Sequence, residues 1–220
     1  MRTSALHHLH LQRATNATAW SIVGDMRLPR AFPRESASLA IADASHLRRT
    51  GLKGPQAATQ LAALGLPVPP RPNTWLPLAG SGLIARLGLT EYLVEDDGSR
   101  TAGMTSASDA AGAYPVMRAD TALVLAGPHA GEVMLQTCNV NFATLQRGEL
   151  ALTSMAGVSV LVIPLRFAQA PLIRIWCDPS YGPYLYRTLL GIVEELGGGP
   201  IGADRLAPML TDSIHSTENP

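Results

Sequence analysis

The sequence has few of the residues on which common covalent and metal chemistries depend. Lys53 is the only lysine, so lysine-based covalent chemistry has a single candidate, and that residue lies beside a predicted turn. The two cysteines, Cys138 and Cys177, have neither metal-ligand spacing nor a disulfide framework. We therefore expect buried free thiols in a reducing compartment, which makes the cytoplasm the predicted location.

Charged residues are also scarce. They make up 15% of the chain, against 46% hydrophobic residues, and the formal net charge is +0. This balance argues against nucleic acids and anionic membranes as partners. No run of about 18 apolar residues occurs, so the sequence predicts no membrane span. An apolar, weakly charged chain is typical of a subunit that buries part of its surface against a partner.

The familiar catalytic motifs are missing, and one partial match lies in the wrong context. The chain contains no G-x-S-x-G, no P-loop and no H-E-x-x-H. Residues Gly80–Ala85, GSGLIA, match the relaxed dinucleotide pattern G-x-G-x-x-A. They follow a proline-broken stretch and open a predicted strand, whereas a nucleotide site needs a helix there. We interpret this stretch as a glycine-rich turn into a strand.

Three residues of the catalytic-triad types stand close together in the segment ADASH. Asp43, Ser45 and His46 are nearly adjacent, and the three roles of a triad need side chains that converge from different places. They therefore cannot form a triad alone.

Two further clusters could suggest a metal. His7, His8 and His10 are accompanied by no carboxylate or cysteine, so we expect a partly ordered arm there rather than a metal site. The acidic turn at 95–98, EDDG, lacks the spacing of a calcium loop. From its residues alone, the chain is predicted to have no catalytic, cofactor-binding or metal site.

One stretch of the sequence occurs twice. Leu52–Leu64 reads LKGPQAATQLAAL and Leu125–Leu135 reads LAGPHAGEVML, each a strand-like run, Gly-Pro and then a helical pattern. Gly54 and Gly127 are 127 − 54 = 73 residues apart. Glycine permits a sharp turn out of a strand, and proline suits the first helical position. The repetition predicts an α+β fold of duplicated strand-helix-strand units with pseudo-two-fold symmetry, in which the Gly-Pro helices occupy equivalent places.

Composition and the positions of glycine, proline and small polar residues predict the domain organisation. The expected parts are an N-terminal arm at 1–35, a first repeat half at 36–100, a flexible loop at 101–113, a second repeat half at 114–205 and a tail at 206–220. The clearest helix lies near the end of the second half. Its apolar face consists of Leu185, Leu189, Ile192, Val193 and Leu196.

Three stretches together resemble a known family. They are Leu64–Asp96 (LGLPVPPRPNTW…GLIARLGLTEYLVED), Leu125–Phe142 (LAGPHAGEVMLQTCNVNF), and the closing pair Ser154–Leu165 with Arg174–Leu190. They are similar to the gamma subunit of heterotetrameric sarcosine oxidase and of its relative, N-methylglutamate dehydrogenase. YPVMRAD at Tyr114–Asp120, together with the ADASHL segment and the ending, is closer to the latter.

The duplicated plan also resembles the folate-binding aminomethyltransferase fold of the glycine-cleavage T-protein. Ala42–His46 is similar to the Asp-x-Ser-His segment near the start of that enzyme, but Arg48 stands where that family usually has glycine. The chain is much shorter than the full T-protein, and none of that enzyme's catalytic carboxylates can be matched to it. Folate binding and transferase activity are therefore not carried over.

The resemblance implies a noncatalytic structural subunit that binds no cofactor itself. In such complexes the alpha subunit carries the NAD and folate sites, the beta subunit binds FAD, FMN lies between them, and the delta subunit binds zinc. The gamma subunit contacts alpha directly, with beta and delta in the same assembly. The alternative is a stand-alone folate-binding, aminomethyltransferase-like protein of one-carbon transfer.

Overall fold

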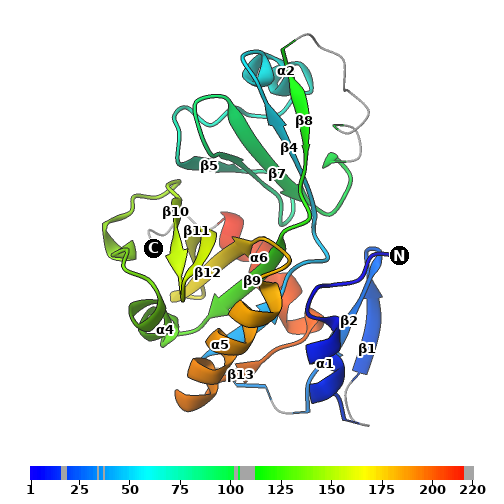
Figure 1. The fold of residues 1–220 in the computed structure, drawn as a ribbon, viewed down its shortest axis with the longest axis vertical. Coiled ribbons are helices and arrows are strands. Elements are labelled where there is room, and N and C mark those ends of the chain that lie inside the picture. Colours follow the sequence, from blue (N-terminus) through cyan, green and yellow to red (C-terminus); the bar gives the residue numbers. More distant parts are fainter. Residues whose placement is uncertain (16–18, 34, 37, 102–103, 105–111, 216–220) are drawn as a thin grey trace. The chain divides into compact units, whose positions relative to one another are not determined.

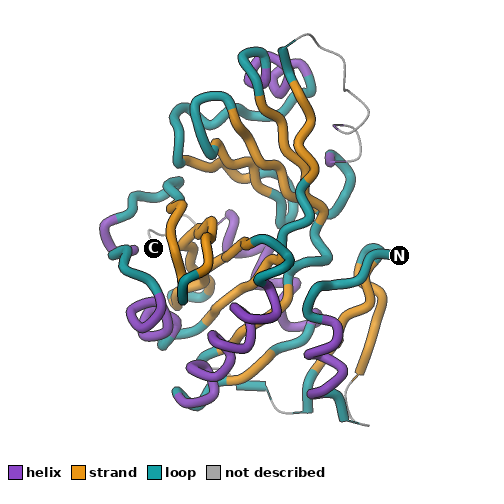
Figure 2. Tube along the Cα trace, viewed as in Figure 1, coloured by secondary structure: helices purple, strands orange, loops and turns teal. Residues whose placement is uncertain are grey.

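The computed structural model describes residues 1–15, 19–33, 35–36, 38–101, 104 and 112–215 (Figure 1). The chain divides into two compact units. Unit 1 holds Met1–His46, Asp120–Arg147 and Ala151–Pro220, and unit 2 holds Leu47–Ala119 and Gly148–Leu150. Sheets and helices occur in both, so the α+β class predicted from the sequence is confirmed (Figure 2).

Unit 1 is built on a six-stranded sheet with helices on its faces. The strands, in spatial order, are β10 (Ala151–Met155), β11 (Val158–Phe167), β12 (Ala170–Cys177), β9 (Thr121–Ala126), β3 (Ala40–Asp43) and β13 (Gly199–Pro200). Every neighbouring pair is antiparallel except β13 with β3. The helices are α1 (His7–Arg13), α4 (Ala130–Thr137), α5 (Gly182–Glu195) and α6 (Ala203–His215), with the short 3-10 helix η1 (Phe142–Thr144). Among the described residues, no helix has the length and apolar character needed to span a bilayer.

The apolar core of unit 1 lies between the sheet and the helices α1, α4 and α5. In α5, Leu185, Leu189 and Val193 are buried, and Ile192 and Leu196 pack against the core from its margin. The predicted apolar face of this helix is therefore confirmed. Strand β9 is buried at all six positions because it lies inside the sheet and is covered on both sides.

Unit 2 is built on a five-stranded antiparallel sheet. Its strands, in spatial order, are β5 (Thr74–Pro77), β6 (Leu83–Arg86), β7 (Glu91–Asp96), β4 (Arg48–Lys53) and β8 (Tyr114–Met117). Helix α2 (Ala57–Ala63) packs Ala57 and Leu61 against Leu52, Tyr92 and Val94 of the sheet. Strands β6 and β7 form a hairpin, and β5, which follows the proline-rich stretch at 67–72, is an edge strand.

The two units repeat one plan in the same register. The order β4-α2-β5-β6-β7 in unit 2 corresponds to β9-α4-β10-β11-β12 in unit 1. Lys53 pairs with Glu91, and Ala126, which is 73 positions later, pairs with Leu172. At the junction, Gly54 N–H donates to Thr90 O and Gly127 N–H to Pro171 O, each at 3.0 Å. The duplication predicted from the two Gly-Pro segments is confirmed, since both helices follow equivalent strands.

The first strand of each repeat pairs within the sheet of the other repeat. Strand β3 precedes β4 in sequence but pairs with β9 in unit 1. Strand β8 precedes β9 but pairs with β4 in unit 2. Because of this exchange the observed units differ from the expected halves at 36–100 and 114–205, and neither unit is a continuous stretch of chain.

The expected arm and tail both contain regular structure within unit 1. The described part of 1–35 contains α1 and the hairpin of β1 (Ala19–Val23) and β2 (Met26–Ala31), and Leu6 and Leu9 enter the core. The expected tail, 206–220, belongs to α6 as far as His215, because α6 buries one face that includes Leu206 and Leu210. Most of the expected loop at 101–113 lies outside the described residues.

Gly54 and Gly127 are held in the same unusual conformation. Their φ angles are +119° and +120°. A Cβ at Gly54 would lie 2.4 Å from Gly112 O, and a Cβ at Gly127 would lie 2.4 Å from Ser38 O. In both cases the obstructing carbonyl belongs to the chain just before the exchanged strand. Glycine is therefore required at both positions for two reasons: the φ angle is positive, and a second backbone segment approaches closely.

We expect Gly54→Ala and Gly127→Ala each to lower the free energy of unfolding by more than about 2 kcal/mol, since strained dihedrals and a backbone clash combine. Gly65→Ala is the matched control: its φ is +71° and no atom lies within 4 Å of an added Cβ, so only about 1 kcal/mol is expected. Urea denaturation measures all three. If Gly54→Ala or Gly127→Ala lowers the free energy of unfolding no more than Gly65→Ala does, the two junctions are not equivalent sites of constraint.

The outer edges of the exchanged strands differ between the units. In unit 1, β13 covers β3, and Ile201 N–H donates to Ile41 O at 2.9 Å. Pro115 holds the equivalent position in β8, since it pairs with Leu52 as Ile41 pairs with Leu125. In the described part of unit 2, no strand pairs with this outer edge. Proline has no N–H to offer there, which is a common way to protect an exposed edge from adding another strand.

We expect Pro115→Val to increase self-association of the chain, because it restores an outward backbone donor on an edge strand that already exposes Tyr114 and Met117. Pro67→Val, at an exposed loop position, serves as the control. Light scattering after size exclusion at matched concentrations measures the effect. Equal masses for both variants and the unsubstituted chain would show that Pro115 does not protect this edge.

Candidate functional site

A buried polar cluster of unit 1 is centred on Asp43, the last residue of β3. Ser4 Oγ donates to Asp43 Oδ2 at 2.5 Å, and His10 Nε2 lies 3.0 Å from the same oxygen. Ser45 N–H donates to Oδ1 at 2.9 Å. Ser4, His10 and Asp43 are 4%, 2% and 7% exposed, so solvent barely reaches the cluster.

The residues singled out in ADASH do not form a triad. Ser45 Oγ accepts a hydrogen bond from Ala122 N–H at 3.1 Å, and the His46 carbonyl accepts one from Arg2 at 2.6 Å. The histidine at Asp43 is His10, which comes from α1. Ser4 and His10 both approach one oxygen of Asp43, whereas a triad needs the serine on the histidine. The geometry indicates a buried structural cluster that fastens the N-terminal segment to the sheet.

Hydrogen bonding makes the Asp43 carboxylate unusually acidic. Burial by itself raises the pKa of Asp43, but the bonds from His10, Ser4 and Ser45 and the attraction of His10 outweigh it and lower the pKa to about 2. Tyr186 lies edge-on to the His10 ring, with 5.7 Å between ring centroids, and burial raises the pKa of Tyr186. The sequence contained a weak sign that His10 faces the core, because it follows Leu6 and Leu9 at helical spacing.

The remaining candidates from the sequence have structural roles. Gly80 turns the chain into β6, which begins at Leu83, so the GSGLIA stretch opens a strand as predicted. Asp96 accepts hydrogen bonds from Gly98 N–H at 2.8 Å and from Arg100 N–H at 2.6 Å, which closes the acidic turn on itself.

Neither cysteine chemistry nor a metal cluster is indicated in the part of the chain that is described. Cys138 and Cys177 are buried free thiols, as predicted. Burial, with Asp120 and Asp178 nearby, raises the pKa of Cys177 to about 12, so its thiol is a poor nucleophile. Within the described ranges, no group of three His, Cys, Asp or Glu side chains could hold a metal ion.

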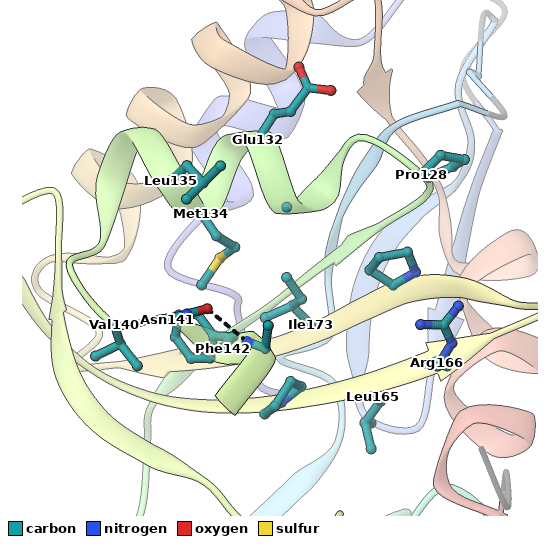
Figure 3. A pocket seen from close by; sticks show the side chains of 14 residues that line it. Pro128, Glu132, Met134, Leu135, Val140, Asn141, Phe142, Leu165, Arg166 and Ile173 are labelled. Carbon is teal, nitrogen blue, oxygen red and sulfur yellow. Dashed lines mark hydrogen bonds between the residues drawn. The ribbon is translucent and has the colours of Figure 1, made fainter. Parts of the chain in front are cut away.

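An apolar cavity of about 530 Å³ lies beside α4 in unit 1 (Figure 3). Met134 points from α4 toward Ile173 and Phe142, while the Glu132 side chain points away from the strands (Figure 3). The walls are mostly apolar. They include Gly131, Met134, Leu135, Val140, Phe142, Pro164, Leu165, Pro171 and Ile173.

Few polar groups border this cavity. Arg166 lies at one end and donates a hydrogen bond to Gln169 O. Asn141 accepts from Ala143 N–H at 3.1 Å, and Glu132 is paired with His129 Nδ1 at 2.6 Å. The described lining contains no serine, cysteine, lysine or histidine. The cavity therefore has the chemistry of a binding site for apolar groups and not that of a catalytic centre.

Comparison with known proteins rests on structure alone. No family model and no curated protein sequence matches the chain. The glycine cleavage system aminomethyltransferase T from Bartonella henselae matches 95% of this chain with a TM-score of 0.74 and 14% sequence identity. The fold is aminomethyltransferase-like. This chain spans 62% of the length of that protein.

A second solved structure has a chain of similar extent. It is the heterotetrameric sarcosine oxidase from Corynebacterium sp. U-96 in complex with pyrrole 2-carboxylate. The match has a TM-score of 0.65 and 17% identity, and it covers 90% of this chain and 97% of the other. The predicted aminomethyltransferase-like architecture is confirmed by both neighbours.

We expect Asp43→Asn to lower the free energy of unfolding at neutral pH by about 2 kcal/mol, because folding lowers the pKa of Asp43 from 3.8 to about 2. Because the pKa of Asp43 is lowered by folding, its contribution is present above pH 4 and is lost as the pH falls from about 4 toward 2. Urea denaturation between pH 7 and pH 2 measures this, with the exposed Asp212→Asn as control. The same pH dependence in both variants would show that Asp43 does not stabilise the fold through its charge.

Proposed function

We propose that this chain is a noncatalytic, gamma-type subunit of a heterotetrameric, flavin-dependent oxidoreductase of N-methyl amino acids. The observation that carries the proposal is the extent of the structural match. A chain of heterotetrameric sarcosine oxidase is covered over 97% of its length, whereas the aminomethyltransferase T is covered over 62%. The match therefore extends over nearly all of one chain of that assembly and over less than two thirds of the T enzyme.

The described sites support a role without catalysis. The polar cluster at Asp43 is buried and joins elements of unit 1 to one another. The cavity beside α4 offers apolar walls. On this proposal the partner subunits carry FAD, FMN, NAD, folate and zinc, and the alpha subunit is the direct neighbour. The contribution of this chain is buried contact surface and rigidity.

The sequence favours N-methyl-L-glutamate over sarcosine as the substrate of the complex. The segments YPVMRAD and ADASHL and the ending from Arg174 are more similar to the gamma chain of N-methylglutamate dehydrogenase. The reaction would be an oxidative N-demethylation on the partner subunits. Since a fold alone does not fix a substrate, turnover has to decide between the two.

We expect the chain, purified from its native source under mild conditions, to elute with three other chains in constant ratio. The assembly should oxidise N-methyl-L-glutamate faster than sarcosine, while the isolated chain should oxidise neither and should retain no flavin absorbance after desalting. Mass spectrometry, visible absorbance and steady-state turnover provide the measurements. Preference for sarcosine would change the substrate and leave the subunit role intact. Elution of the chain alone, with its own activity, would overturn the role.

The higher TM-score of 0.74 supports one alternative, a stand-alone folate-binding protein of one-carbon transfer. Titration of the isolated chain with tetrahydrofolate in a calorimeter separates the two functions. We expect no measurable heat of binding. Micromolar binding with one ligand per chain would favour the alternative.

A further inference from the structure

We propose that the cavity beside α4 and a smaller neighbouring cavity together bind an extended segment of a partner subunit, in which apolar anchor side chains are accompanied by acidic residues. This inference rests on the proposed function, because it supplies the docking surface that a subunit needs. It is confined to residues of unit 1.

The two cavities adjoin at one end of the sheet. The larger, of about 530 Å³, lies on the side of α4, and the smaller, of about 290 Å³, reaches Arg205 and Met209 of α6. Pro128 and Pro171 line both. These two prolines form the ridge between the two apolar hollows. Because proline has no backbone N–H, neither offers a hydrogen-bond donor there. A surface of this form accepts separate side chains of an extended segment, as peptide-binding grooves do.

The larger cavity suits an apolar anchor. Its volume lies within the range of about 300–1,000 Å³ of ordinary binding sites. Leu135, on its rim, is 82% exposed. A small ligand inside one cavity would leave this leucine and the second cavity in water. A partner segment that covers the ridge buries both, and buried anchors in pockets provide most of the affinity of protein interfaces.

The charges of the lining indicate acidic residues in the occupant. Arg166 borders the larger cavity and Arg205 the smaller. The one carboxylate in the described linings, Glu132, is paired with His129 and points away from the strands (Figure 3). The Arg205 guanidinium beside an apolar hollow complements a carboxylate of the partner, and Arg166, which also donates to Gln169 O, adds positive charge to the lining. Such complementarity favours specific association.

The hairpin between the cavities is also conformationally unusual. Ala168 and Gln169, at the turn from β11 to β12, have φ angles of +48° and +70°, although neither is glycine or asparagine. Ala168 lines the smaller cavity, and the bond from Arg166 to Gln169 O holds the turn. Backbone conformations of this kind persist where surrounding contacts fix them, and they concentrate at binding sites.

Gly131 permits a direct test, because it lies in α4, lines the larger cavity and has no atom within 4 Å of an added Cβ. A Cβ added at this position meets open space, a longer side chain starts from the cavity wall, and helix propensity improves over glycine. Gly191 in α5 is the matched control: it is an exposed helical glycine with equally open surroundings, and it lines neither cavity. The series Gly131→Ala, Gly131→Leu and Gly131→Phe places side chains of increasing size at the cavity wall.

The measurement is the apparent Kd of the purified chain for the remaining subunits of its native complex. We expect Gly131→Phe to weaken assembly by at least about tenfold, Gly131→Ala to have little effect, and Gly191→Phe to remain near the unsubstituted value. Arg205→Glu should weaken assembly more at low than at high salt, because salt screens exposed charges. Thermal unfolding verifies that all variants are folded.

The outcomes separate the two proposals. If the unsubstituted chain does not assemble with other subunits, both fail. If it assembles and Gly131→Phe assembles equally well, the cavities are not the docking surface, and the subunit role stands. A dimer of the isolated chain that Gly131→Phe dissociates would identify a second copy as the occupant and overturn the partner segment. A small molecule seen by native mass spectrometry and lost in Gly131→Phe would overturn it as well.

Discussion

The structure depends on one backbone constraint, the close approach of a carbonyl group to a glycine at the start of each Gly-Pro helix. Ser38 O would lie 2.4 Å from a Cβ at Gly127, and Gly112 O would lie 2.4 Å from a Cβ at Gly54. Each contact joins the end of one repeat's strand to the chain that leads into the other repeat's first strand. Only glycine allows this approach at φ near +120°. The exchanged strands β3 and β8 are thereby fixed in register beside β9 and β4.

The exchange leaves equivalent positions with different surroundings, and the N-terminal segment covers one of them. Asp43 in β3 corresponds to Met117 in β8, because they pair with Leu123 and Thr50, which are 73 residues apart. Met117 is 94% exposed, whereas Asp43 is buried beneath α1 and bonded to His10. The charge at Asp43 is tolerated in the interior because three hydrogen bonds replace those of water.

Local sequence patterns predicted the individual helices and strands of this fold better than they predicted which strands pair with one another. The Gly-Pro junctions and the apolar face of α5 were recognisable because each depends on residues close in sequence. The exchange of β3 and β8 was not recognisable, since a strand's pattern shows that one face is buried and not which sheet buries it. The contact between His10 and Asp43 spans 33 positions, and ADASH by itself suggested His46.

Helix α6 was missed for a different reason. Pro208 stands inside it, and proline normally ends a helical pattern. The helix persists because its buried face, which includes Leu206, Leu210 and Ile214, packs on unit 1. Tertiary packing here outweighs local propensity, which is a weak guide when an amphipathic face has a surface to cover. The second expected half ends at Arg205, which lies inside α6.

The two repeats kept their backbone geometry while their buried side chains diverged. Arg49 and Glu95 form a buried ion pair at 2.6 Å across β4 and β7. The equivalent positions across β9 and β12 hold Ala122 and Trp176.

A buried ion pair and an apolar pair can occupy the same place in a ladder because the strand register fixes only the positions of the Cα atoms. Removing one partner of the ion pair leaves an uncompensated charge, so the pair is retained or lost as a unit. The same reasoning explains the comparisons, in which the backbone matches over 90–95% of the chain at 14–17% identity. Within this chain the two repeats share the junction glycines and the strand register, although the side chains they carry differ.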